Sequence, residues 1–90
     1  MIDRWCIRVS GRVHGVFFRA SARAAALDMD IKGFVRNEPD GTVYIEAEGA
    51  EGNLERFLEW CRHGPEHAKV HEVHVTKADS IGFTSFEITY

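Results

Sequence analysis

The residues with the clearest chemical potential lie in one short segment near the start of the chain. Residues 9 to 19 read Val-Ser-Gly-Arg-Val-His-Gly-Val-Phe-Phe-Arg. Glycines at 11 and 15 permit tight backbone turns with exposed N–H groups. A helix predicted to begin near Phe18 adds the unpaired N–H groups and the positive dipole end of its first turn. Together these features predict a backbone loop that holds an anion such as phosphate.

Arg19 falls in that predicted first helical turn, where its positive charge opposes the helix dipole. A bound anion would satisfy both the guanidinium and the dipole, whereas the alternative is an exposed arginine at a small energetic cost. A planar guanidinium can hold two phosphoryl oxygens at once, which an ammonium cannot. The spacing matches neither Gly-x-x-x-x-Gly-Lys-Ser/Thr nor Gly-x-Gly-x-x-Gly, so nucleotide binding by those motifs is unsupported.

Asn37 is the second polar candidate, and it ends a predicted strand just before a Pro-Asp-Gly turn. Asparagine is common at such positions because its amide satisfies turn backbone, so Asn37 alone says little. In the predicted sheet order, however, this strand end faces the anion loop. We therefore expect Asn37 to lie near Arg19.

The elements that position these residues follow from the spacing of apolar side chains. Period-two alternation predicts strands near residues 4–10, 31–37, 42–48, 70–77 and 86–90. The fourth of these changes parity between Val70 and Val73, which suggests a bulge or a late strand start. An Ala-rich run over 18–29 and apolar residues at 54, 57, 58 and 61 predict two helices, the second ended by Gly64-Pro65.

This order of elements predicts the fold class α+β. A βαββαβ order plus a short C-terminal strand, with right-handed crossovers, gives a ferredoxin-like α/β sandwich. We expect an antiparallel sheet with two helices on one face. Ninety residues suit a single domain spanning 1–90.

Charge and cysteine content exclude several functional classes. The net charge of −3 disfavours a general nucleic-acid binder. Five arginines stand against one acid in residues 1–23, however, so positive charge gathers near the anion loop. No apolar window is long enough for a membrane span or signal peptide, and two cysteines make no disulfide framework. We expect a cytoplasmic protein without an internal disulfide.

Three rival interpretations rest on weaker patterns. Cys6 and Arg12 match the Cys-x5-Arg spacing of covalent cysteine phosphatases, but Cys6 lies in the middle of a predicted strand. A Lys-Gly-Phe-Val run at residues 32–35 matches part of an RNA-recognition motif, which leaves a non-catalytic anion- or RNA-binding module as an alternative. Histidines 63, 67, 71 and 74 lack the geometry of a metal site, because His71 and His74 point to opposite faces of a strand.

Taken together, three segments resemble the acylphosphatase family. They run from Gly11 to Arg19, from Gly33 to Asn37 and from Asp40 to Val43. Length, element order and a Phe-x-Ile-x-Tyr ending extend the resemblance over the whole chain, and the Gly-x-Val-x-Gly-Val-x-Phe-Arg signature is specific.

The resemblance implies hydrolysis of the carboxyl-phosphate bond of acyl phosphates by an oriented water, with no cofactor and no metal. Arg19 falls on the family's phosphate-binding arginine, and Asn37 falls on the asparagine that positions the water. The phosphate cradle corresponds to the backbone amides of His14, Gly15, Val16, Phe17, Phe18 and Arg19. His14 stands where the family usually has Gln. This change is silent if only its N–H contacts the anion, and otherwise it brings a titratable side chain near the site.

The resemblance also sets expectations about partners. We expect small-molecule acyl phosphates as substrates and inorganic phosphate as a product. A monomer with no nucleic-acid and no membrane partner is expected as well.

Overall fold

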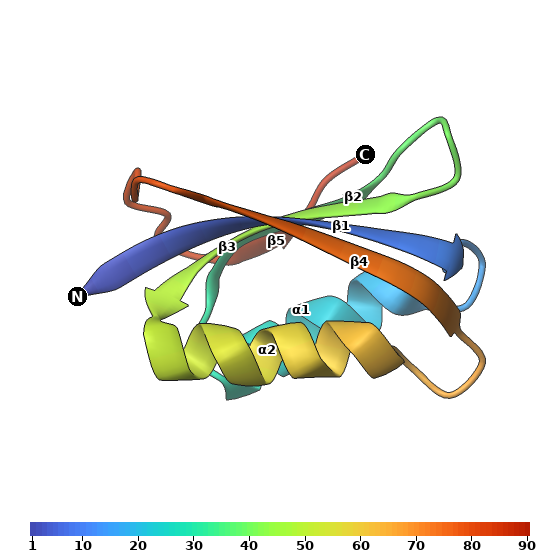
Figure 1. Ribbon diagram of the computed structural model, residues 1–90, viewed down its shortest axis with the longest axis horizontal. Coiled ribbons are helices and arrows are strands. Elements are labelled where there is room, and N and C mark those ends of the chain that lie inside the picture. The colour runs from blue at the N-terminus through green and yellow to red at the C-terminus, as the bar shows by residue number, and fades with distance from the viewer.

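The computed structural model describes all residues from 1 to 90 and contains five strands and two helices. In chain order the elements are β1 (Ile2–Arg12), α1 (Phe18–Asp28), β2 (Lys32–Asn37), β3 (Val43–Ala50), α2 (Glu51–His63), β4 (Lys69–Ala78) and β5 (Phe86–Ile88). The strands form one sheet in the order β4-β1-β3-β2-β5, and both helices cover the same face of it (Figure 1). The predicted ferredoxin-like sandwich is confirmed. Neither helix is long and apolar enough to cross a membrane.

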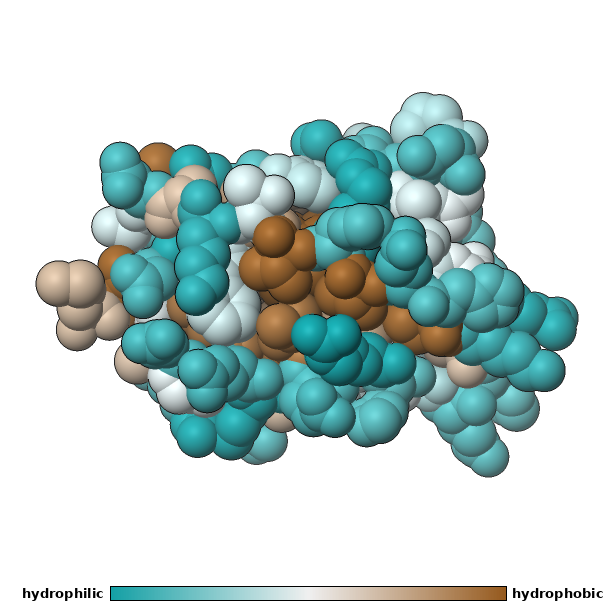
Figure 2. All heavy atoms as spheres, in the orientation of Figure 1, coloured by the Kyte–Doolittle hydropathy of each residue, from teal (hydrophilic) through white to brown (hydrophobic).

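The core lies between the sheet and the two helices. The inward residues of β1, predicted from their alternation, are buried, and so are Val43, Ile45 and Ala47 of β3. Phe57 of α2 packs edge-on against Phe86 of β5 with ring centroids 6.0 Å apart, which joins the second helix to the last strand. Apolar residues also reach the surface at the seam between β4 and α2, where Figure 2 shows a strip of them bordered by polar residues.

The sheet differs from the prediction at one edge. β1, β2, β3 and β4 pair antiparallel, whereas β5 adds to β2 in parallel. β5 also ends at Ile88, so Tyr90 lies beyond the strand that was expected to contain it. The physical reason is the connection after β4, which crosses from one edge of the sheet to the other before the chain enters β5.

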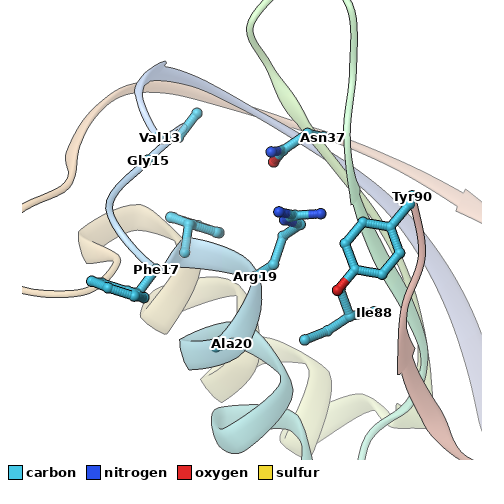
Figure 3. Close-up of a pocket in the computed structure, with 9 residues that line it drawn as sticks. Val13, Gly15, Phe17, Arg19, Ala20, Asn37, Ile88 and Tyr90 are labelled. Carbon is cyan, nitrogen blue, oxygen red and sulfur yellow. The ribbon is translucent and has the colours of Figure 1, made fainter.

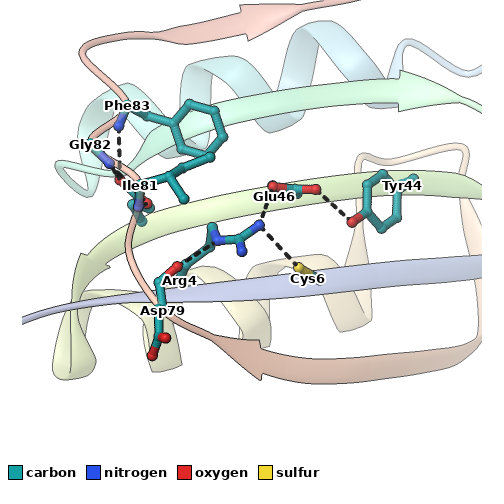
Figure 4. A network of polar contacts seen from close by, with 9 residues as sticks. Arg4, Cys6, Tyr44, Glu46, Asp79, Ile81, Gly82 and Phe83 are labelled. Carbon is teal, nitrogen blue, oxygen red and sulfur yellow. Dashed lines mark hydrogen bonds and ion pairs between the residues drawn. The ribbon is translucent and has the colours of Figure 1, made fainter.

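A buried carboxylate fixes that crossing segment. Glu48 lies on the sheet face opposite the helices and is only 3% exposed. Its carboxylate accepts hydrogen bonds from the backbone N–H groups of Ile81, Gly82 and Phe83 (Figure 4). A buried charge is tolerated when hydrogen bonds compensate its desolvation, and three donors do so here. Glu48 therefore sets the path by which the chain reaches β5.

The predicted bulge lies in β4, opposite the end of β1. Ser10 pairs with Glu72 and Gly11 pairs with Val70, so His71 is the extra residue. Gly11 has a φ of 126°, and a Cβ there would overlap the carbonyl oxygen of Lys69. Only glycine permits this close approach of the two strands. The bulge brings the start of β4 against the end of β1, directly before the anion loop.

Candidate active site

The loop from residue 13 to residue 17 joins β1 to α1 and is shaped by two left-handed residues. Gly15 has a φ of 69° and Phe17, which precedes the helix, has a φ of 61°. A bulky residue in this region is strained by roughly 1 to 3 kcal/mol, and such strain concentrates at functional sites. Phe17 is also 82% exposed, so its side chain gains little from burial in return.

The backbone N–H groups of this loop are free. Those from His14 to Arg19 donate no hydrogen bond within the protein, and the N–H of Ser21 is the first to bond back to the loop, at the Phe17 carbonyl. The helix has no side-chain cap and no acidic residue in its first turn. Unpaired donors and the helix dipole therefore remain available to an anion.

Arg19 and Asn37 face each other across a cavity of about 310 Å³ beside this loop (Figure 3). Arg19 comes from the first turn of α1 and Asn37 from the last position of β2. The structure brings Asn37 and Arg19 together, because both line the same cavity. No Asp or Glu side chain lines it, so the guanidinium has no carboxylate partner there.

The other wall of the cavity comes from the end of the chain, which the sequence did not assign to the site. Ile88 and Tyr90 line the cavity, and the Arg19 Cζ lies 4.9 Å from the centroid of the Tyr90 ring. Such a cation–π contact is worth about 0.5 to 1 kcal/mol at an exposed position and orients the guanidinium. The alternation of Phe86, Ile88 and Tyr90 was visible in the sequence, but not that this segment adds beside β2.

Asn37 is held by a well-bonded turn. The N–H of Glu38 donates to the carbonyl of Thr42 at 2.8 Å, and the Asp40 carboxylate accepts both the hydroxyl and the N–H of Thr42. These hydrogen bonds from Thr42, the hydroxyl's first, lower the pKa of Asp40 below its usual 3.8. The turn therefore fixes the end of β2 from which Asn37 projects.

The His14 side chain contacts the turn that follows Asn37. Its Nε2 lies 2.8 Å from the carbonyl oxygen of Thr42, to which the ring donates. The side chain is not among those that line the cavity. The His14 side chain therefore ties the anion loop to the turn beyond Asn37.

Cys6 lies elsewhere. It is in the middle of β1, pairs with Glu46 of β3 and approaches the Arg4 guanidinium, whose Nη1 is 3.9 Å from its Sγ (Figure 4). Arg4 also forms an ion pair with Glu46 at 2.7 Å, which raises the pKa of Arg4. The other thiol, Cys61, is fully buried in α2, and burial raises its pKa. Neither sulfur lines the cavity, so the structure gives the cysteine phosphatase interpretation no support.

The class of protein is thus a ferredoxin-like α+β sandwich whose cavity joins a guanidinium, a carboxamide and a loop of free backbone donors. The family model for acylphosphatase matches residues 5–88. The acylphosphatase of Marinobacter nauticus is 44% identical over 90 residues, covering 99% of this chain and 98% of that one. The acylphosphatase of Archaeoglobus fulgidus is 48% identical over 84 residues, covering 93% and 94%.

Solved structures agree with this similarity. The crystal structure of the acylphosphatase from Bacillus subtilis superposes with a TM-score of 0.95 at 38% sequence identity, and the match covers 100% of both chains. The chain belongs to the acylphosphatase family.

Proposed function

We propose that the protein hydrolyses the carboxyl-phosphate bond of acyl phosphates with the loop amides, Arg19 and Asn37 as its machinery. Family membership supports the reaction. One geometric observation supports these residues: the Arg19 guanidinium and the Asn37 carboxamide converge on one cavity beside a loop of unpartnered N–H groups. The products are a carboxylate and inorganic phosphate.

The phosphoryl group is held by the loop and by Arg19. Backbone N–H groups from His14 to Arg19 donate to phosphoryl oxygens, and the guanidinium binds two of these oxygens at once. Phosphoryl transfer depends mainly on positioning and on stabilisation of charge, because little covalent chemistry is left for the protein. Fixed donors and one guanidinium are sufficient for that purpose.

Asn37 orients the attacking water. Its carboxamide offers both a donor and an acceptor, so it can hold a water molecule in line with the bond that breaks. The leaving group is a carboxylate whose conjugate acid has a pKa of roughly 4, so it departs without a general acid. This agrees with a cavity that no Asp or Glu side chain lines. A phosphate oxygen of the substrate accepts the proton of the water.

A direct test compares two substrates. Benzoyl phosphate carries the carboxyl-phosphate bond, and 4-nitrophenyl phosphate is a phosphate monoester with a poorer leaving group. We expect turnover of the first alone, without a phosphorylated enzyme intermediate. Turnover of the monoester with covalent capture of phosphate would point to a cysteine mechanism, and binding without turnover of either would point to a non-catalytic module.

We further infer that the protein acts as a monomer in the cytoplasm, without a nucleic-acid partner. Both cysteines are free thiols, which suits a reducing compartment. The net charge of −3 opposes association with polyanions. Sedimentation tests the monomeric state, and a titration with single-stranded RNA at low salt tests the absence of a nucleic-acid partner.

A further inference from the structure

A second cavity lies on the other flank of the anion loop. It has a volume of about 490 Å³ and is lined by Arg12, His67 and Lys69 together with loop residues. Only Gly15 and Phe17 line both this cavity and the one that contains Arg19. The first opens toward β2 and β5, and the second opens toward the start of β4. The loop backbone is thus the shared wall between them.

The charges in this second cavity are unbalanced. Arg12 and Lys69 are direct cross-strand partners in the antiparallel pair of β1 and β4. Like charges in that position destabilise a sheet. Neither belongs to any of the ion pairs in the structure. Glu66 is the one carboxylate in the lining, which also includes the His67 side chain.

The backbone at the start of β4 holds Arg12 and Lys69 side by side. The bulge at His71 and the close approach of Gly11 to the Lys69 carbonyl press the start of β4 against the end of β1. Without the bulge, the start of β4 would shift by one residue relative to Arg12, and residue 69 would change faces. The chain therefore keeps two like charges side by side next to the anion loop, where an anion would stabilise both.

The residues shared by the two cavities form an apolar ridge between them. Phe17 is 82% exposed and carries no charge, and Gly15 has no side chain. An acyl group attached to a phosphate in the loop can cross this ridge, with its hydrocarbon part on the Phe17 ring and its far end near Arg12 and Lys69. Arg19 on one side of the ridge and Arg12 and Lys69 on the other then match a substrate that is anionic at both ends.

We propose that Arg12, His67 and Lys69 form a second anion subsite, which receives a carboxylate or phosphoryl group on the acyl part of the substrate. The protein then prefers acyl phosphates that carry a second negative charge. This inference rests on the proposed function, because it requires the substrate phosphate to occupy the loop beside Arg19. The chemistry recognised is an anionic oxygen group, which the acyl part or a free phosphate ion can supply.

The test measures kcat/KM for benzoyl phosphate and for its 3- and 4-carboxy derivatives, which keep the benzoyl phosphate group and add a second negative charge. The readout is the ratio of the carboxylated to the plain substrate. We expect a ratio above one in the unaltered protein, and a fall of about two- to fivefold in Arg12→Gln and in Lys69→Gln. The ratio also falls with added salt, because exposed charges are screened.

Lys77→Gln is the matched control, since it removes the same charge from the other end of β4 and should leave the ratio unchanged. Equal ratios in Lys69→Gln and Lys77→Gln, with benzoyl phosphate still hydrolysed, would overturn the subsite alone. Absence of hydrolysis of benzoyl phosphate by the unaltered protein would overturn the proposed function instead. A third outcome would assign the cavity to a free anion and contradict the substrate subsite. In that outcome inorganic phosphate alters benzoyl phosphate turnover non-competitively, and Lys69→Gln removes this effect but leaves the ratio of the two substrates unchanged.

Discussion

Replacing Arg19 by alanine should abolish most of the activity without unfolding the protein. The guanidinium has no carboxylate partner, and its one described contact is the Tyr90 ring at 4.9 Å. Its donors are therefore free for the phosphoryl group. Each charge-assisted hydrogen bond contributes about 1.5 to 3 kcal/mol, so a two-oxygen contact contributes about 3 to 6 kcal/mol. At about 1.4 kcal/mol for each factor of ten, kcat/KM should fall by roughly 10² to 10⁴.

The assay follows benzoyl phosphate hydrolysis with inorganic phosphate as a competitive inhibitor. Arg19→Ala should lose phosphate inhibition together with turnover, and Arg19→Lys should recover little because an ammonium cannot hold two oxygens in a fixed plane. Arg23→Ala is the matched control. Arg23 lies one turn further along α1, and its Nε donates to the Phe86 carbonyl at 3.1 Å, outside the cavity. If Arg19→Ala and Arg23→Ala had the same kcat/KM, the anion would be bound elsewhere.

Four further changes test other parts of the structure. Asn37→Ala should lower kcat by about a hundredfold with little change in KM, and a tenfold rise in KM at constant kcat would contradict water positioning. Cys6→Ser, and separately an excess of chelator, should leave kcat nearly unchanged, and loss of activity on either treatment would restore a covalent or metal mechanism. Glu48→Ala should lower the free energy of unfolding by about 3 kcal/mol in denaturant titrations, because three backbone donors lose their buried acceptor. The folded-state pKa of Asp40 lies below 3.8, so ionised Asp40 stabilises the fold above that pH, and this contribution is lost as the pH falls through the lowered pKa. In Asp40→Asn the free energy of unfolding should therefore decrease less between neutral and acidic pH.

Local patterns in the sequence were sufficient to predict most of the fold. Alternation in β1 and β3 and the apolar stripe of α2 are set by which side chains face the core, so their periods can be recognised without knowledge of distant contacts. The bulge in β4 was visible for the same reason, since one extra residue reverses the parity. The parallel pairing of β5 was not predictable this way, because it depends on Glu48 binding residues more than thirty positions away.

The candidate site likewise contains residues that local sequence patterns indicate and residues that depend on distant contacts. Local glycine and helix-start signals indicate Arg19 and the loop amides, whereas the role of Asn37 came from the resemblance to the family, because an asparagine at a strand end says little by itself. Tyr90, by contrast, lies beside Arg19 only because β5 joins β2, and the ring interaction of His14 with Thr42 depends on how two loops approach. A strand pattern describes which way a side chain points. It does not name the strand's neighbour.

The dependence of the cavity on β5 has a consequence for the order in which the molecule opens. β5 has only three residues and lies at a sheet edge, with hydrogen bonds from the Gly33 N–H to the Ser85 carbonyl and from the Thr89 N–H to the Val35 carbonyl at its two ends. Short edge strands detach by local fluctuations that cost less free energy than global unfolding. Opening of the chain beyond Phe86, whose ring stays packed against Phe57, would remove the Ile88 and Tyr90 wall while β1, β3 and the helices stay packed. On gentle heating or in dilute denaturant, we therefore expect activity to decline before the core unfolds. The Thr89 amide should exchange its hydrogen faster than the amides of β1. A bound phosphate should slow the exchange at Thr89.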